Sequence, residues 1–153
     1  MLYNEITVVD DSDIVGWVAG AARVGEVYMT DVRSMVTNVA RQAGRRPIDR
    51  LNILDHGNSS GVEMGTDWID ETNFTTFEPF FILLRGRFAR NGFVHLQHCE
   101  VGSNHRLLTM FARAFGVRVY AGTGAHNPVY RINFGEYDYC DPTGSCVHDA
   151  ARP

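Results

Sequence analysis

The chain has 153 residues, of which 44% are hydrophobic and 21% charged, a composition typical of a folded globular protein and not of a disordered one. Its 14 basic and 18 acidic side chains give a formal net charge of −4, which favours neither nucleic acid nor an anionic membrane as a partner. The amino terminus lacks the pattern of a secretory signal, and no apolar run is long enough to span a membrane, so we expect a protein that is cytoplasmic or part of a larger exported one.

The first half of the chain alternates between β-rich runs and helical patterns. Strands are predicted at residues 5–9, 26–29 and 48–55, and a hairpin turned by Gly65 at residues 62–64 and 67–69. One helix is predicted at residues 13–23. A second helix is predicted between an N-cap at Thr30 and a stop at Gly44.

The second half continues this alternation. Helices are predicted over residues 73–90 and from an N-cap at Ser103 through Phe115, and buried strands at residues 93–99 and 117–121. Residues 129–139 contain two β-rich pieces joined at Gly135, which indicates an antiparallel hairpin at one edge.

Strands connected by helices favour right-handed crossovers and a parallel sheet with helices on both faces. The predicted fold is therefore α/β, a three-layer αβα sandwich with a mainly parallel sheet and a C-terminal β-hairpin. We expect one domain over residues 1–139, followed by a tail at 140–153.

Two reactive side chains follow neighbouring strands of the predicted sheet. His56 comes directly after the strand at 48–55, and Cys99 ends the strand at 93–99. Because ligands bind at the carboxyl ends of parallel strands, the imidazole and the thiol are expected on one rim. An imidazole in that position can take the proton of a thiol and deliver it to a leaving amine. The N–H groups of Gly57 and Cys99 are suited to an oxyanion hole.

The two strand ends, LNILDHG and FVHLQHC, resemble the paired signature of the clan of caspases, gingipains, clostripain and metacaspases. The segments ITVVDDSD, HGNSSGVEMG, HCEVGS and VRVYAGTG are similar to those of bacterial caspase-like domains found at the amino ends of large secreted or surface proteins. The resemblance spans residues 5–124. Around Cys99 the sequence departs from the caspase signature Gln-Ala-Cys, so the chain is not a caspase proper.

This resemblance implies a caspase-like cysteine peptidase that needs no cofactor and acts on a peptide or protein substrate, or processes itself. In the clan, the substrate pocket is shaped by the end of the first strand, the strand before the nucleophile and the loop after the last parallel strand. The matching residues here are Asp10, Asp11, Gln97, Glu100, Gly122, Thr123 and Gly124. Carboxylates in such a wall would favour cleavage after Arg or Lys. The alternative is that Asp10 and Asp11 only cap the following helix.

Two other classes of function stay open. The first is a catalytically inactive binding module on the same scaffold, with Cys99 as an inert thiol. The second is a zinc-binding domain, for which the candidate ligands are His56, His98, Cys99 and His105, or Cys140, Cys146 and His148. Consecutive residues in a strand point to opposite faces, which argues against His98 and Cys99 sharing an ion. Cys140 and Cys146 are spaced more widely than usual zinc ligands, and they are alternatively a disulfide pair.

Overall fold

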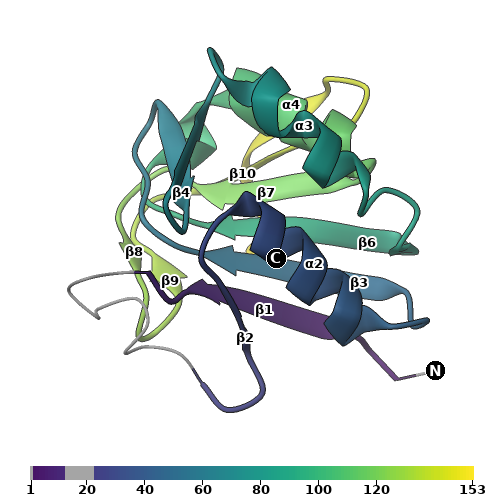
Figure 1. Ribbon diagram of the computed structural model, residues 1–153. Helices are drawn as coiled ribbons and strands as arrows, with labels where there is room; N and C mark the ends of the chain where they lie inside the picture. Colours follow the sequence, from purple (N-terminus) through teal and green to yellow (C-terminus); the bar gives the residue numbers. More distant parts are fainter. Residues whose placement is uncertain (1, 13–22) are drawn as a thin grey trace.

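The computed structural model describes residues 2–12 and 23–153, so the helix predicted at 13–23 lies almost entirely outside the described residues. A seven-stranded sheet in the order β11-β10-β7-β6-β3-β1-β2 forms its centre (Figure 1). The parallel strands are β1 (Glu5–Asp10), β2 (Val27–Met29), β3 (Ile48–Leu54), β6 (Phe88–Gln97) and β7 (Arg118–Gly122). The antiparallel strands are β10 (Tyr137–Cys140) and β11 (Cys146–Ala150). The predicted α/β class with a mainly parallel sheet is confirmed.

The three described helices lie on one face of the sheet (Figure 1). They are α2 (Val32–Ala43), α3 (Phe74–Ile82) and α4 (His105–Phe115). The strands β2, β3, β6 and β7 follow one another in the same direction across the sheet, so right-handed crossovers put their helices on the same side. Alternate strand residues such as Ile53 and Leu96 join the helices in one hydrophobic core. These helices form one of the two helical layers that the predicted sandwich requires.

The opposite face of the sheet is polar at its centre. Its strand positions include Thr7, Asn52 and Gln97, which line a cavity. No helix within residues 2–12 and 23–153 covers this face. None of the helices in this part of the chain is long and apolar enough to span a membrane.

Two helix starts differ by one residue from the prediction. Asp31, not Thr30, is the N-cap of α2, because its carboxylate accepts the Ser34 N–H at 2.7 Å while the Ser34 hydroxyl accepts the Asp31 N–H at 3.1 Å. Asn104, not Ser103, is the N-cap of α4 and accepts the N–H of Leu107. Ser103 ends a short 3₁₀ helix, η1 (Val101–Ser103).

The helix predicted over residues 73–90 was too long. The structure ends α3 at Ile82, and Gly86 then adopts a positive φ of 87°, which turns the chain into β6. The apolar stripe continues past the helix because Leu84 is buried in the turn and Phe88 pairs with Ile48 in the sheet. Apolar spacing alone did not reveal this change of structure.

The predicted hairpin at 129–139 was also misplaced. Within that region, β9 (Ile132–Asn133) pairs with β8 (His126–Asn127), which lies before it, and β10 begins at Tyr137 and pairs with β7 and β11. The antiparallel edge is the β10–β11 hairpin, whose turn is closed where the Asp141 N–H donates to the Ser145 carbonyl at 2.9 Å. Residues 146–150, expected in the tail, thus belong to the same sheet, and a disulfide joins Cys140 to Cys146.

The predicted hairpin around Gly65 is confirmed as β4 (Gly61–Met64) and β5 (Asp67–Asp70). Gly65 has a φ of 64°, and a Cβ added there would lie 2.0 Å from the carbonyl oxygen of Thr30. The Thr66 N–H donates to that same oxygen at 2.8 Å. The start of α2 therefore anchors the hairpin that follows His56.

Candidate active site

The structure brings together the ends of the two strands that carry the predicted dyad. β3 and β6 pair in parallel up to Leu54 opposite Gln97, and His56 and Cys99 each follow two residues after the end of their strand. Gly57 confirms this closeness, because a Cβ added to it would lie 3.4 Å from the Cys99 carbonyl oxygen. The segments that follow β3 and β6, which contain His56 and Cys99, are therefore neighbours at one rim of the sheet.

Cys99 has a free thiol, and the residue as a whole is half-buried. The backbone N–H of His126 donates to its sulfur at 3.3 Å. The thiol in turn donates to the carbonyl oxygen of His126 at 4.0 Å, so both backbone groups of this residue contact the sulfur. The sequence did not point to His126, because it lies in a loop 27 residues after the cysteine.

The ring of His126 is a poor candidate for the base. Burial, together with the charges of Arg131 and Arg152, lowers the pKa of His126 to about 4, so its ring is neutral at pH 7. His98 is fully buried on the other side of the strand, where its Nε2 hydrogen bonds to the Glu63 carbonyl at 2.8 Å. Burial lowers the pKa of His98 to about 3. His56 is half-exposed and follows β3 at the same rim as Cys99.

A tight turn follows the cysteine. Glu100 has a φ of 62°, a conformation that is uncommon for residues other than glycine and is concentrated at functional sites. The turn is held where the Val101 N–H donates to the Cys99 carbonyl at 2.7 Å and the Glu100 N–H donates to Gly124 at 2.9 Å. The thiol thus lies at a strand–turn–helix junction.

The backbone N–H of Gly57, the predicted oxyanion-hole donor, is not used in the bridge that this residue forms. Gly57 forms an isolated antiparallel bridge with Val62, whose hydrogen bonds are made by the flanking residues Asn58 and Glu63. In such a pair the N–H of Gly57 itself points away from the partner strand. It is therefore available to a group that approaches from the side of Cys99.

Asp55 is a buried carboxyl group directly before His56, which sequence reasoning did not single out. Its two oxygens accept the N–H groups of His56 and Gly65, each at 2.8 Å. Burial, together with the nearby carboxylate of Asp10, raises the pKa of Asp55 to about 8, although these two hydrogen bonds act in the opposite direction. Asp55 is therefore protonated at pH 7 and holds the backbone at His56 without adding a charge.

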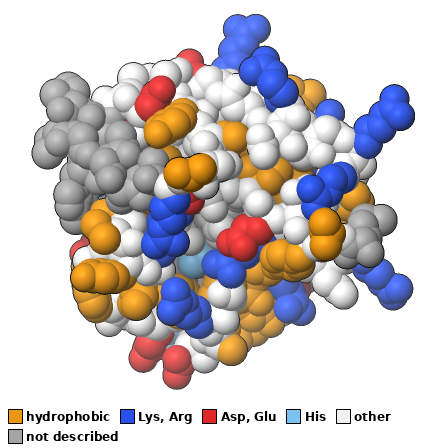
Figure 2. All heavy atoms as spheres, turned by 90° about the horizontal axis from the view of Figure 1, so that it is seen from below, with side chains coloured by type: hydrophobic (Ala, Val, Ile, Leu, Met, Phe, Trp, Pro, Cys, Tyr) orange, Lys and Arg blue, Asp and Glu red, His pale blue; other side chains and the backbone are white. Residues whose placement is uncertain are grey.

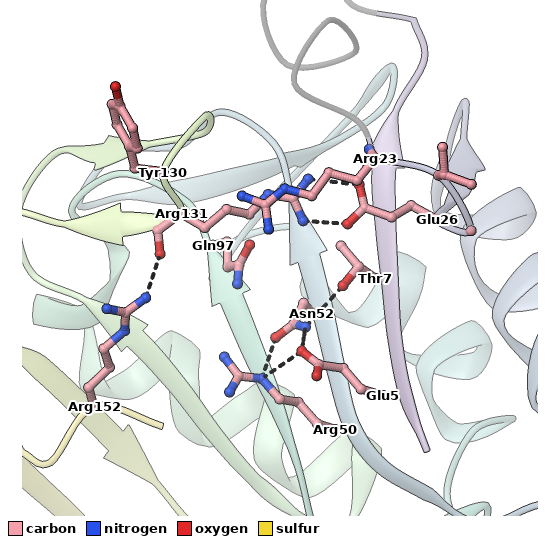
Figure 3. A pocket seen from close by; sticks show the side chains of 12 residues that line it. Glu5, Thr7, Arg23, Glu26, Arg50, Asn52, Gln97, Tyr130, Arg131 and Arg152 are labelled. Carbon is pink, nitrogen blue, oxygen red and sulfur yellow. Dashed lines mark hydrogen bonds and ion pairs between the residues drawn. The ribbon is translucent and has the colours of Figure 1, made fainter. Parts of the chain in front are cut away.

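A cavity of about 520 Å³ opens on the polar face of the sheet (Figure 3). Of the predicted pocket residues, Gln97 lines it. Asp10 and Asp11 are not among its described lining residues. Asp10 is instead buried and accepts hydrogen bonds from the backbone and hydroxyl of Ser12. The described lining consists of Glu5, Thr7, Arg23, Val24, Gly25, Glu26, Arg50, Asn52, Gln97, Tyr130, Arg131 and Arg152.

Three further residues of the predicted pocket, Gly122, Thr123 and Gly124, contact residues 133–136. A Cβ added to Gly122 would lie 2.0 Å from Asn133, and the Gly124 N–H donates to the Asn133 side chain at 2.9 Å. The hydroxyl of Thr123 accepts the N–H of Glu136. These contacts position the loop beside the turn at Glu100 and not in the cavity.

The predicted zinc sets are not assembled in the described part of the chain. The groups there with ligand atoms close enough for a metal are His105 with Cys140 and Cys146, and a carboxylate group of Asp10, Asp55 and Glu63. Neither group includes the dyad. The two sulfurs of the first group are bonded to each other. His148 pairs instead with acidic side chains, Asp138 at 2.8 Å and Glu136 at 2.9 Å.

No family model matches the sequence, and no curated protein matches it at a significant level.

Proposed function

We propose that this protein is a caspase-like cysteine peptidase, with Cys99 as the nucleophile and His56 as the general acid and base. The observation that carries the proposal is the parallel pairing of β3 with β6, which aligns the two residues at the same rim. Three features of the site support it: the half-exposed free thiol, the N–H of His126 on the sulfur, and the left-handed turn at Glu100.

The residues present are sufficient for both steps of peptide hydrolysis. His56 takes the thiol proton, and the Cys99 sulfur attacks the substrate carbonyl carbon. The oxygen becomes negatively charged and is bound by the N–H groups of Gly57 and Cys99. His56 then protonates the leaving amine as the C–N bond breaks. Water, deprotonated by His56, hydrolyses the resulting thioester and restores the free thiol.

The test is labelling with a series of electrophilic peptide probes, followed by mass-spectrometric mapping of the modified residue. We expect label on Cys99 in the wild-type protein. Cys99→Ala should remove the label, and His56→Ala should slow labelling and hydrolysis at least a hundredfold, since general-base catalysis contributes about that much. His148→Ala, an exposed histidine of β11 outside the site, is the matched control and should behave as wild type. Unchanged peptide hydrolysis by Cys99→Ala would eliminate the nucleophile assignment.

Labelling, zinc analysis and intact-mass measurement separate the two alternatives and detect self-processing. An inactive binding module would show slow, unselective alkylation of Cys99. A zinc-binding domain would contain about one equivalent of zinc in a purified, reduced sample, held by His105, Cys140 and Cys146, whose ligand atoms lie close together. Self-processing would appear as a loss of intact mass with time in the wild-type protein and not in Cys99→Ala.

A further inference from the structure

The disulfide between Cys140 and Cys146 presents its two sulfurs unequally. Cys140 is fully buried, and its Sγ lies 3.5 Å from the carbonyl oxygen of His105. Cys146 is half-buried and lines a cavity of about 490 Å³ beside α4. Figure 1 shows the turn between the two cysteines, in yellow, next to this helix. A thiol that enters the cavity therefore meets Cys146 and not Cys140.

A histidine lies close to both sulfurs. A ring nitrogen of His105 and the Sγ atoms of Cys140 and Cys146 lie within 4.8 Å of one another. The Nε2 of His105 is hydrogen-bonded to the buried carboxylate of Asp138 at 2.6 Å, which holds the ring beside the disulfide. When a thiolate attacks a disulfide, one sulfur leaves as a thiolate, and a nearby imidazole can protonate it. His105 is placed for that role.

The cavity beside the disulfide is lined by basic side chains. On the face of the molecule shown in Figure 2, basic side chains lie beside acidic ones. The described lining of this cavity instead contains Arg106, Arg113 and His105 and no carboxylate. Arg106 pairs with Glu71 at 3.1 Å, and Arg113 donates to a backbone carbonyl, so no acid among the described residues compensates Arg113. A positive charge here stabilises a thiolate and attracts a thiol that carries a further negative charge.

The hairpin that carries the two cysteines is also held by hydrogen bonds. Cys140 and Cys146 are directly opposite each other in the β10–β11 ladder. In the turn between them, the carboxylate of Asp141 accepts the N–H groups of Thr143 and Ser145. We therefore expect the hairpin to keep the two thiols face to face after reduction. The disulfide closes a short loop, so it adds little to the stability of the fold, and the fold in turn adds little to the stability of the bond.

We propose that this disulfide is a reactive site of its own, which exchanges with small anionic thiols. A thiolate attacks the Sγ of Cys146, and the S–S bond breaks with its electron pair on the sulfur of Cys140. The Cys140 thiolate takes a proton from the His105 ring, and a mixed disulfide remains on Cys146. The inference does not depend on the proposed peptidase function.

A second thiolate completes the reaction. It attacks the sulfur of the thiol bound to Cys146, and the disulfide of the two small thiols leaves. The Cys146 thiolate takes a proton, so the protein then holds two free thiols. Two small thiols are oxidised and one protein disulfide is reduced, and the two protons that the small thiols release balance the two that the cysteines take up.

The test uses Cys99→Ala, in which Cys140 and Cys146 are the only cysteines. A chelator is present, so that zinc does not bind the released thiols. The protein is mixed with 3-mercaptopropionate, 2-mercaptoethanol or cysteamine, which carry a carboxylate, a hydroxyl and an ammonium group, at equal thiolate concentration. Iodoacetamide traps free thiols at early times for mass-spectrometric mapping. We expect the thiol adduct on Cys146 and the alkyl group on Cys140.

Replacement of His105 tests the proton donor. His105→Gln should slow formation of the adduct at least tenfold, because the leaving thiolate loses its acid. His148→Gln is the matched control. His148 binds the other oxygen of Asp138 at 2.8 Å but is not in the group around the sulfurs, so this variant should react as wild type. Equal rates for the two variants, with both shown to be folded by thermal unfolding, would remove His105 from the mechanism.

The charge of the thiol tests the cavity without any change at His105. We expect the anionic thiol to react severalfold faster than the cationic one, by a ratio that decreases as salt is raised. Arg113→Gln, an exposed residue of α4, should remove most of this preference, whereas Arg41→Gln on α2 should leave it unchanged. An adduct on Cys140, equal rates for the three thiols, or a disulfide that stays intact in all of them overturns the proposal.

Discussion

Replacing Asp55 by Asn should change the free energy of unfolding, relative to wild type, in favour of the variant as pH rises. Folding raises the pKa of Asp55 to about 8, whereas an unfolded Asp ionises near pH 3.9. Between these values the folded state binds one proton more than the unfolded state. The stability from this group is therefore complete below pH 3.9 and is lost as pH rises to about 8, at about 1.4 kcal/mol per pH unit. Between pH 5 and pH 7 the loss is about 2.7 kcal/mol.

Urea unfolding of the wild-type protein and of Asp55→Asn at pH 5, 6 and 7 measures this effect. The variant also loses one acceptor for the N–H groups of His56 and Gly65, but this cost is the same at each pH and cancels when the differences are compared. Asp11→Asn, an exposed carboxyl group one residue after β1, is the control for the change in net charge. A wild-type-to-variant difference that stays constant from pH 5 to pH 7 would refute the assignment of a protonated Asp55.

Three further predictions concern stability. Changing Cys140 and Cys146 together to Ser should lower the free energy of unfolding by about 2 kcal/mol, because the disulfide closes a short loop; thermal unfolding measures this loss. The alkylation rate of Cys99, the remaining cysteine, should stay unchanged. Gly65→Ala should destabilise the protein more than Gly25→Ala in urea unfolding, because both glycines have a positive φ but only the first has a backbone oxygen 2.0 Å from the added Cβ. Equal losses would show that φ alone matters. Asp31→Ala should lower the free energy of unfolding by about 1 kcal/mol through loss of its cap, and a value near zero would contradict the capping box.

Local sequence patterns were sufficient for the parallel strands of the sheet. The run of apolar residues before His56 and the one before Cys99 each end in a polar turn, and both are buried strands in the structure. Helical spacing of apolar residues was misleading where one apolar stripe runs from a helix into the following turn and strand. Leu84 and Phe88 continue the spacing of α3, yet the positive φ of Gly86 separates them from the helix.

The surroundings of the site were harder to predict than its two reactive residues. The contact of the His126 N–H with the Cys99 sulfur depends on the path of a loop, which no spacing rule describes. The burial of Asp10 beside Asp55 depends on the register of β1 with β3. A carboxylate that the sequence suggests for a pocket wall can be buried instead once that register is known.

The two ends of the sheet have a shape that discourages growth. At one end β2 is three residues long. At the other, the pairing of β11 with β10 shifts register between Tyr137 and Tyr139, and Asp149 adopts a φ of 53°. Short and irregular edge strands are poor templates for strand addition by another chain. Within residues 2–12 and 23–153, the outer strands of the sheet thus present no long straight edge to which an extended peptide or a second copy could add as a further strand.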